Sequence, residues 1–436
     1  MNRYFDGDPD ALVNHQIESF NNLMTDTIPS MLRHKPIEVK HGPRMSRFEI
    51  LQVYTSKPVQ HGTDTGYQPM TPHEARVLDR NYAAPVFIDF KQTFRNGDRE
   101  FTEIEQKVPL WGQPVLVGSK FCHLYGKTVA ERVALNECRY DRGGYFIIKG
   151  SEKVVVAQER PVDNKIMLFK TSKTSTSGFE ARAEVKSTPD QRFYPIKSCT
   201  VFLTKDKQAK KEGSIPGRKL ECGIPHIRVP KGRNGIPLFV VFKALGLVPD
   251  RTIFEYIIGD TDKAHNEHIN MLIPSAQEAT EVQTQLDAIR YISNFVNYTP
   301  PTGTEETVEE DKLRYTKDIL NREYLSHLGQ NGLKKAAFLA TMVRKLLDAM
   351  IDPVLFSDRD HYSNKRVDLV GPLLAQIIRF NLQKLFRNIR VSMAQHITSS
   401  PDGVNPDIRS ILQKCDLETK VRYAPVSYTH LTLPTT

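Results

Sequence analysis

Two stretches carry residue types that bind phosphate or metal, but neither has the complete spacing of such a site. The stretch GSKFCHLYGKT ends in Gly-Lys-Thr at 126–128, like a phosphate-binding loop. Phe121 stands where that loop needs its first glycine, so the backbone cannot wrap a phosphate there. His265 and His268 lie one helical turn apart, yet no further cysteine or histidine follows at ligand spacing. We therefore expect a solvated histidine pair and neither a phosphate loop nor a metal site.

The closest acidic pair lies in the charge-dense stretch DRDHYSNKR at 358–366. Asp358 and Asp360 are separated by Arg359, and Lys365 and Arg366 follow them. Because cations alternate with carboxylates, the pattern favours an ion-pair network over a two-metal site. No serine sits in a G-x-S-x-G elbow, although a dispersed triad stays open because triads are spatial. The sequence therefore indicates no catalytic residue.

A run without acidic residues, between Asp368 and Asp402, contains the clearest candidate binding site. At 100° per residue, one half of a helix here is apolar. That half consists of Leu374, Ile377, Ile378, Leu382, Leu385, Ile389 and Met393. The opposite face carries the basic residues Arg379, Lys384, Arg387 and Arg390. Such a face is either simply solvated or neutralises phosphates, and we interpret it as the candidate nucleic-acid-binding surface.

Length and charge are consistent with this interpretation. The chain has 436 residues, 39% of them hydrophobic, which is enough for two or three domains with buried cores. Its 60 Lys and Arg residues against 51 Asp and Glu residues give a formal net charge of +9. A positive balance of this kind favours polyanionic partners, with nucleic acid the leading class.

Cysteine usage and hydropathy indicate the compartment. The 5 cysteines are widely separated and never form a C-x-x-C pair, so neither a disulfide framework nor a zinc site is indicated. The polar start lacks the apolar core of a signal peptide. The most apolar stretch, 236–249, is interrupted by Lys243 and is too short to cross a bilayer. We expect an intracellular protein without a membrane partner.

The elements that would position these residues change in type along the chain. A helix is predicted within 8–32, and β-branched and aromatic runs at 48–55, 84–94 and 108–119 predict strands. The composition becomes polar and basic after Lys170, which indicates a domain boundary near that residue. Strands and then helices follow to about Met350. The pattern predicts an α+β fold with two mixed α/β domains.

One stretch, RYDRGGYFIIKGSEKVVVAQER at 139–160, reads as a tight hairpin. Short apolar runs at 145–148 and 153–157 flank the connection 149–152, whose Lys-Gly-Ser-Glu composition suits a turn. Gly143 and Gly144 add backbone freedom before the first strand. By itself this stretch predicts a fold element and no chemistry.

The same stretch resembles a signature of the second-largest, beta-like subunit of eukaryotic-type multisubunit DNA-directed RNA polymerases. Further segments look like those of this family in the same order, and the resemblance extends to about Arg422. They are TPHEARVLDRNYAAPVFIDF at 71–90, IPLFVVFKALGLVPD at 236–250, YTKDILNREYLSHLG at 315–329 and DRDHYSNKRVDLVGPLLAQ at 358–376.

The resemblance implies a domain organisation. Residues 1–171 would form the first part of a protrusion domain, 172–365 an inserted lobe, and 366–424 the second part of the protrusion. The stretch 358–366 would be the crossover between the two domains, and its ion pairs would fix the orientation of one domain relative to the other. The last residues, 425–436, have no counterpart in the family and are expected to be a non-native read-through tail, or else a disordered natural tail.

The resemblance also implies a function. The chain would be an N-terminal fragment of a polymerase that transcribes DNA into RNA, forming one wall of the DNA cleft and inactive by itself. Implied partners are the largest and other polymerase subunits, the DNA template, the DNA-RNA hybrid and initiation factors. No cofactor is expected in the fragment, whereas the complete enzyme would use Mg²⁺ and structural Zn²⁺.

Two alternatives and the location stay open at this point. The chain could be a stand-alone nucleic-acid or transcription-factor binding module built from the same two domains, or an unrelated hydrolase with dispersed catalytic residues. The resemblance fits a nuclear enzyme if the source is cellular, and a viral factory or virion if a large DNA virus encodes it.

Overall fold

The chain forms two compact units, each with its own sheet. The computed structural model describes residues 11–33, 36–42, 44–62, 66–97, 99–172, 178–189, 196–205, 217–227, 235–259, 266–298, 305–399, 407–413 and 419–423. Unit 1 comprises Met1–Arg160 and Val367–Thr436, and unit 2 comprises Pro161–Arg366. The chain therefore leaves unit 1 once, builds unit 2 and returns. The predicted α+β class is confirmed.

Unit 1 is built on a four-stranded antiparallel sheet with the strand order β1-β2-β5-β6. Side chains of β5 alternate between buried and half-buried positions, as expected of a strand with one face against a core. Ala84, Val86, Ile88 and Phe90 form the buried face. The bounds are β1 Ile37–His41, β2 Arg44–Thr55, β5 Ala83–Asn96 and β6 Arg99–Pro114.

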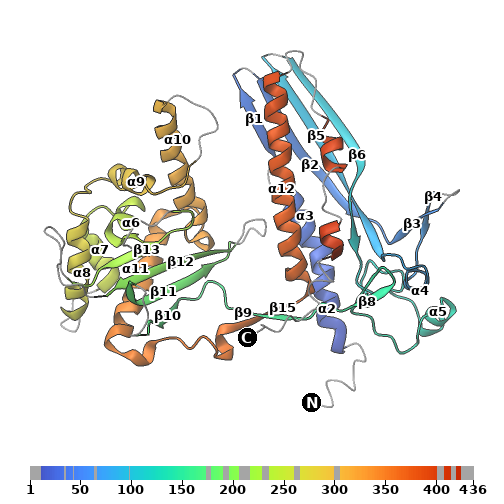
Figure 1. Ribbon diagram of the computed structural model, residues 1–436, viewed down its shortest axis with the longest axis horizontal. Coiled ribbons are helices and arrows are strands. Elements are labelled where there is room, and N and C mark those ends of the chain that lie inside the picture. The colour runs from blue at the N-terminus through green and yellow to red at the C-terminus, as the bar shows by residue number, and fades with distance from the viewer. Residues whose placement is uncertain are drawn as a thin grey trace. The chain divides into compact units, whose positions relative to one another are not determined.

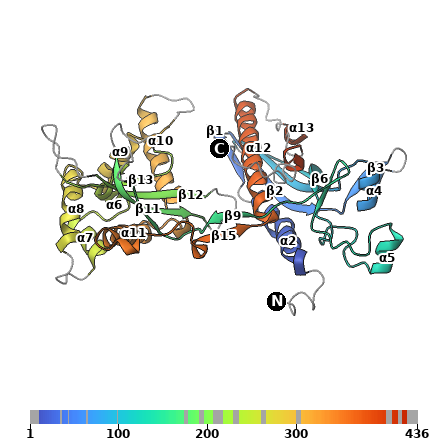
Figure 2. The same ribbon diagram turned by 60° about the horizontal axis from the view of Figure 1, so that its bottom comes forward.

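Helices pack beside this sheet. Figures 1 and 2 both show the 30-residue helix α12 running alongside β1 and β2. Its first turn meets the N-terminal helix at Gly371, where a Cβ would lie 2.4 Å from the carbonyl oxygen of Ser19. Glycine is therefore required for this close approach. The helices are α2 Ala11–Asn22, η1 Leu23–Thr27, α3 Ile28–Leu32, α12 Val370–Ser399 and α13 Ile408–Gln413.

The hairpin in 139–160 forms, but it is tighter than the sequence predicts. Strand β7, Phe146–Ile148, pairs with β8, Ser151–Lys153, through a two-residue turn. The turn residues Lys149 and Gly150 have φ values of 50° and 72°. Two positive φ values define the turn whose twist matches the flanking strands. The predicted four-residue connection and the second strand at 153–157 are therefore wrong.

Smaller elements complete unit 1 and the two crossings between the units. Strand β9, where the chain leaves unit 1, pairs with β15, where it returns. The bounds are β3 Val59–Gly62, β4 Gly66–Pro69, α4 Pro72–Val77, α5 Val129–Ala134, β9 Gln158–Pro161 and β15 Lys365–Asp368. The sequence prediction starts the inserted domain at residue 172 and ends it at 365, whereas unit 2 starts at Pro161 and ends at Arg366.

Unit 2 has a five-stranded sheet, in the order β10-β11-β12-β13-β14, with helices packed on it. Its strands are β10 Met167–Lys170, β11 Phe179–Ser187, β12 Lys197–Thr204, β13 Leu220–Gly223 and β14 Ile236–Pro237. Its longer helices are α6 Leu238–Ala244, α7 Asp250–Ile258, α8 Asn266–Glu278, α9 Gln285–Ser293, α10 Glu305–Asp318 and α11 Gly332–Ile351. The short helices η3 Ile319–Glu323, η4 Ser326–Leu328, η5 Pro353–Leu355 and η6 Tyr362–Asn364 link them.

A buried lysine holds part of this core together. Lys335 in α11 donates to the carbonyl oxygens of Leu320, Asn321 and Tyr324 at 2.7, 2.8 and 2.6 Å. Burial lowers the pKa of this lysine to about 8. These carbonyl groups lie at the end of η3, where a helix leaves its last carbonyls without backbone donors. Lys335 supplies the missing donors. Lys335 is therefore a structural residue of unit 2.

Candidate nucleic-acid interface

Helix α12 has the apolar face that its sequence predicts. Six of the seven predicted residues are fully buried, and Ile377 is half-buried. The helix packs with β1, β2 and α2, so these side chains contribute to the core of unit 1. This packing fixes the rotation of the helix about its axis and therefore decides which residues face outward.

The four predicted basic residues separate into two environments. Lys384, Arg387 and Arg390 are exposed, whereas Arg379 is half-buried. Burial lowers the pKa of Arg379 from its ordinary value, and its buried Nε has no hydrogen-bond partner among the described residues. No described carboxylate forms an ion pair with the three exposed cations. These three are therefore accessible charges, and Arg379 is not equivalent to them.

Sequence reasoning missed two apolar residues on the same outward face. Phe380 is 68% exposed and Val391 50% exposed. At 100° per residue they lie close to Lys384 and Arg387 around the helix axis. The helical projection could have found both, because they fall outside the apolar half that it defines.

The crossover residues form fewer ion pairs with one another than the predicted network would have. Lys365 lies 3.9 Å from Asp360, whose side chain is 92% exposed. Arg359 stacks over the Phe169 ring, with 4.4 Å between guanidinium carbon and ring centroid. Asp358 accepts the backbone N–H of Asp360 at 2.9 Å.

Arg366 and two neighbouring pairs complete this region. The Arg366 guanidinium donates to the carbonyl oxygen of Lys365 at 2.7 Å. The buried carboxylate of Asp368 accepts from Arg160 Nε at 2.7 Å. Lys165 Nζ donates to Asn364 at 2.7 Å. Neither of these pairs was predicted, because their members are about 200 residues apart in the sequence.

A second charged cluster, also not predicted, surrounds Arg76 in α4. Its guanidinium contacts Glu137 at 2.9 Å, Glu152 at 2.7 Å and the Tyr145 hydroxyl at 2.5 Å. Burial lowers the pKa of Arg76, but the interactions with Glu137, Tyr145 and Glu152 together outweigh this, so the pKa is raised. The Tyr145 hydroxyl also donates to Asp141. One arginine thus joins α4, the glycine-rich loop and the hairpin.

The sequence motifs for phosphate and metal have structural roles instead. Thr128 is the N-cap of α5 and forms a capping box with Glu131. His268 is only 4% exposed and lies 3.1 Å from Asp348, so the predicted solvated pair is wrong for this histidine. His265 lies outside the described residues.

A serine and a histidine do meet in unit 2, but not as a catalytic pair. Ser187 Oγ lies 2.9 Å from His327 Nδ1 and also accepts the His327 backbone N–H at 3.2 Å. Ser187 is fully buried at the end of β11. Because the side chain of Ser187 is buried, we interpret this contact as a structural link between the end of β11 and η4.

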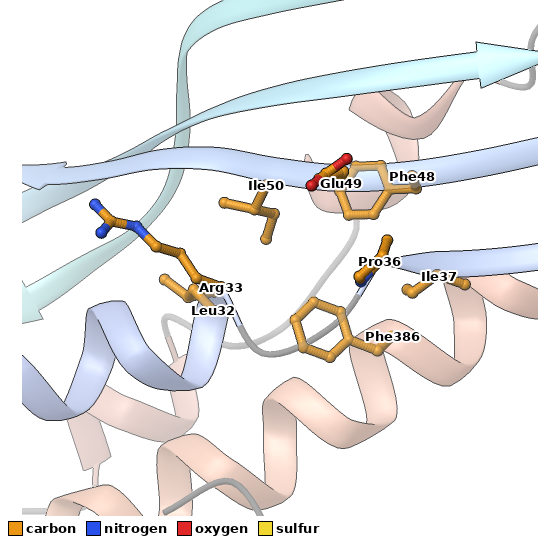
Figure 3. A pocket seen from close by; sticks show the side chains of 8 residues that line it. All are labelled: Leu32, Arg33, Pro36, Ile37, Phe48, Glu49, Ile50 and Phe386. Carbon is orange, nitrogen blue, oxygen red and sulfur yellow. The ribbon is translucent and has the colours of Figure 1, made fainter. Parts of the chain in front are cut away.

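Figure 3 shows a small pocket between α3, β1, β2 and α12. Its volume is about 40 Å³, and its apolar lining includes Phe48, Ile50 and Phe386. Pockets that bind cofactors or substrates usually enclose about 300 Å³ or more. This one therefore has no room for a nucleotide.

The described residues also contain no set of three or more His, Cys, Asp or Glu side chains that could hold a metal ion. The family resemblance implies Mg²⁺ and Zn²⁺ for the complete enzyme and no cofactor for this part of it, which stays a prediction. None of the described helices is both long and apolar enough to cross a bilayer.

The described residues thus form two units with mixed helices and strands, and helix α12 of unit 1 carries three exposed cations. Comparison with known proteins identifies the family. The family model described as "RNA polymerase beta subunit" matches residues 11–414. The chain belongs to this family.

Individual relatives agree with this assignment. The chain is 32% identical over 416 residues to DNA-directed RNA polymerase II subunit 2 of Arabidopsis thaliana, covering 91% of this chain and 34% of the relative. It is 32% identical to DNA-directed RNA polymerase II subunit RPB2 of Encephalitozoon cuniculi, covering 89% of this chain and 32% of that protein.

An archaeal relative is shorter. DNA-directed RNA polymerase subunit Rpo2N of Methanococcus vannielii is 28% identical, covering 95% of this chain and 77% of the relative. The chain thus spans about a third of the length of the eukaryotic relatives and most of this archaeal one.

Proposed function

We infer that this chain is the N-terminal part of the second-largest subunit of a DNA-directed RNA polymerase. The match of the beta-subunit family model to residues 11–414 is the observation that carries this proposal. In the complete complex the reaction is nucleotidyl transfer from nucleoside triphosphates to the growing RNA, with release of pyrophosphate, and the DNA template directs the sequence. Unit 1 corresponds to the protrusion and unit 2 to the lobe, two domains that form one wall of the DNA cleft.

Within that wall, the exposed face of α12 contacts nucleic acid. Lys384, Arg387 and Arg390 contribute three positive charges without a described carboxylate partner, on a helix that has no acidic residue. Such charges bind phosphates by releasing counterions, and they position the nucleic acid without specifying its sequence. Arg379 is a weaker candidate, because its guanidinium is half-buried.

The chain by itself has no polymerase activity. Its described residues include no group of three or more side chains that could hold a metal ion, and the reaction depends on the remaining subunits. Its partners are the largest and other polymerase subunits, the DNA template, the DNA-RNA hybrid and initiation factors. The enzyme works in the nucleus if cellular, and in a viral factory or virion if viral.

The alternative is a stand-alone binding module made of the same two units. The shorter archaeal relative, of which this chain covers 77%, is itself named as a polymerase subunit and therefore does not favour this alternative. Such a module would bind nucleic acid or a transcription factor without joining a polymerase.

Reconstitution separates these functions. The chain is added to polymerase subunits in which the second-largest subunit lacks its N-terminal third, and RNA synthesis on a primed template is measured. We expect synthesis only in the mixture, with the chain co-purifying with the largest subunit. Nucleic-acid binding without co-purification would instead support the stand-alone module.

A further inference from the structure

Strand β6 contributes an open edge to the sheet of unit 1. It is the last strand in the order β1-β2-β5-β6, and it pairs with β5 alone. In an antiparallel ladder, alternate residues of an edge strand direct both N–H and C=O away from the sheet. Apart from this pairing with β5, no described residue forms a backbone hydrogen bond with residues 99–106.

This open edge is limited at both ends. It begins after the turn at Gly97, which has a φ of 59°. It ends at Lys107, which has a φ of 54° and donates its backbone N–H to Asp89 at 2.7 Å. The Asp89 carboxylate also accepts the Tyr54 hydroxyl at 2.8 Å, which fixes this bulge. Eight residues remain between these points, a length of about 26 Å for an extended strand.

Most of this segment is uncovered, although α13 lies against β6 and its Arg409 is 3.9 Å from the Glu105 carboxylate. Seven of its eight residues are exposed, and Glu105 is half-buried. Phe101 and Ile104 are 51% and 53% exposed, and their register against Phe94 and Lys91 places them on opposite faces. Large apolar side chains on both faces of an open edge can pack against an added strand.

The charge of the segment selects the class of partner. Residues 99–106 contain one arginine and three glutamates, a net charge of −2 in a chain whose total is +9. A second copy of the chain is disfavoured, since antiparallel pairing of Phe101 with Ile104 would place Glu100 opposite Glu105. A basic strand would pair its cations with Glu100 and Glu103, because Glu105 already lies 3.9 Å from Arg409.

We propose that residues 99–106 of β6 are a docking site for a basic, extended segment of another protein, which adds a fifth strand to the sheet. The backbone supplies the hydrogen bonds, Phe101 and Ile104 supply apolar contacts, and Glu100 and Glu103 select for positive charge. This surface takes no part in the nucleic-acid contacts assigned to α12.

The test uses a fluorescent eight-residue peptide in which lysine alternates with valine and isoleucine. Its binding to the chain is measured by anisotropy, and backbone protection by hydrogen exchange. We expect saturable binding with slower exchange confined to residues 99–106. In the double variant Glu100→Lys/Glu103→Lys, affinity should fall about tenfold, because like charges then face each other across the strands.

Two controls make the outcome decisive. Glu18→Lys/Glu281→Lys makes the same change in net charge at two exposed positions outside β6 and should leave affinity unchanged. A peptide with glutamate in place of lysine should not bind. The proposal would be overturned if the variant Glu100→Lys/Glu103→Lys bound the peptide with unchanged affinity, or if the peptide slowed exchange outside residues 99–106. Self-association of the chain through β6, measured by sedimentation, would also overturn it.

Discussion

Arg76 explains how the glycine-rich hairpin is held in place. Its three partners, Glu137, Tyr145 and Glu152, lie 61 to 76 residues away in the sequence. The Glu137 carboxylate is only 3% exposed, so it depends on the guanidinium for compensation of its charge. A buried charge that loses its partner is more destabilising than the pair was stabilising.

Replacing Arg76 by alanine should therefore destabilise unit 1 by about 2–4 kcal/mol. Trp111 is the only tryptophan and is buried in unit 1, so its fluorescence in urea reports the unfolding of that unit. Arg76→Lys should recover only part of the loss, because an ammonium cannot match the planar fork. Arg139→Ala, at an exposed position, is the control, and an equal loss there would refute the role of Arg76.

Gly150 supports a second prediction about the hairpin. Its φ is 72°, and a Cβ there would lie 2.4 Å from Asp79 Oδ1 and 3.0 Å from the Arg76 carbonyl oxygen. Gly150→Ala should cost about 2–4 kcal/mol in the same urea experiment, from backbone strain plus the steric clash. Gly42 has a φ of 58° with nothing within 4 Å, so Gly42→Ala should cost only about 1 kcal/mol. Equal costs would show that the close contact is unimportant.

At the scale of elements, the core of unit 2 should be sensitive to alkaline pH. Cys199 in β12 is fully buried, and burial raises the pKa of its thiol to about 11 from an ordinary value of 9.0. Below pH 9 the thiol is protonated in both the folded and the unfolded chain. Between pH 9 and 11 the unfolded chain loses this proton first, so the stability that the protonated thiol contributes is lost as pH rises.

The difference between wild type and Cys199→Ala isolates this effect. The free-energy difference of unfolding should be constant below pH 9 and then decrease by about 3 kcal/mol up to pH 11. Hydrogen exchange of peptides from β12 and β13 measures it, since Trp111 reports the other unit. Cys138→Ala, an exposed thiol of unit 1, should not alter the curve. A difference that stays flat across this range would contradict the prediction.

Sequence patterns predicted features that depend on local periodicity, but not those that depend on tertiary packing. Helical spacing predicted the buried face of α12, because local periodicity determines which side of a helix is apolar. It did not separate Arg379 from the exposed cations, because that depends on the neighbours packed at the edge of the face. The sequence predicted the hairpin but a connection of four residues. The actual turn has two residues, because Lys149 and Gly150 both adopt positive φ, which is unusual for lysine. The Arg76 cluster was beyond prediction, because its members meet only through tertiary structure.

At the scale of the whole molecule, unit 2 should fold without unit 1. Its hydrophobic core is formed by residues between Leu168 and Ala349, all within Pro161–Arg366. A unit with its own core can fold as an independent domain. A chain of residues 161–366 should therefore unfold cooperatively on heating and retain the slow-exchanging amides of β11, β12 and α11. A non-cooperative transition would contradict this.

The central claim, that the exposed face of α12 binds nucleic acid through phosphates, is tested most directly by the salt dependence of DNA affinity. The chain and its triple variant Lys384→Ala/Arg387→Ala/Arg390→Ala are titrated with duplex DNA over a range of salt concentrations. Loss of three phosphate contacts should make the slope of log K against log salt less steep by about 2–3. The control variant Arg251→Ala/Arg314→Ala removes two exposed cations of unit 2 and should leave the slope unchanged. A triple variant with the wild-type slope would show that α12 does not contact the nucleic acid.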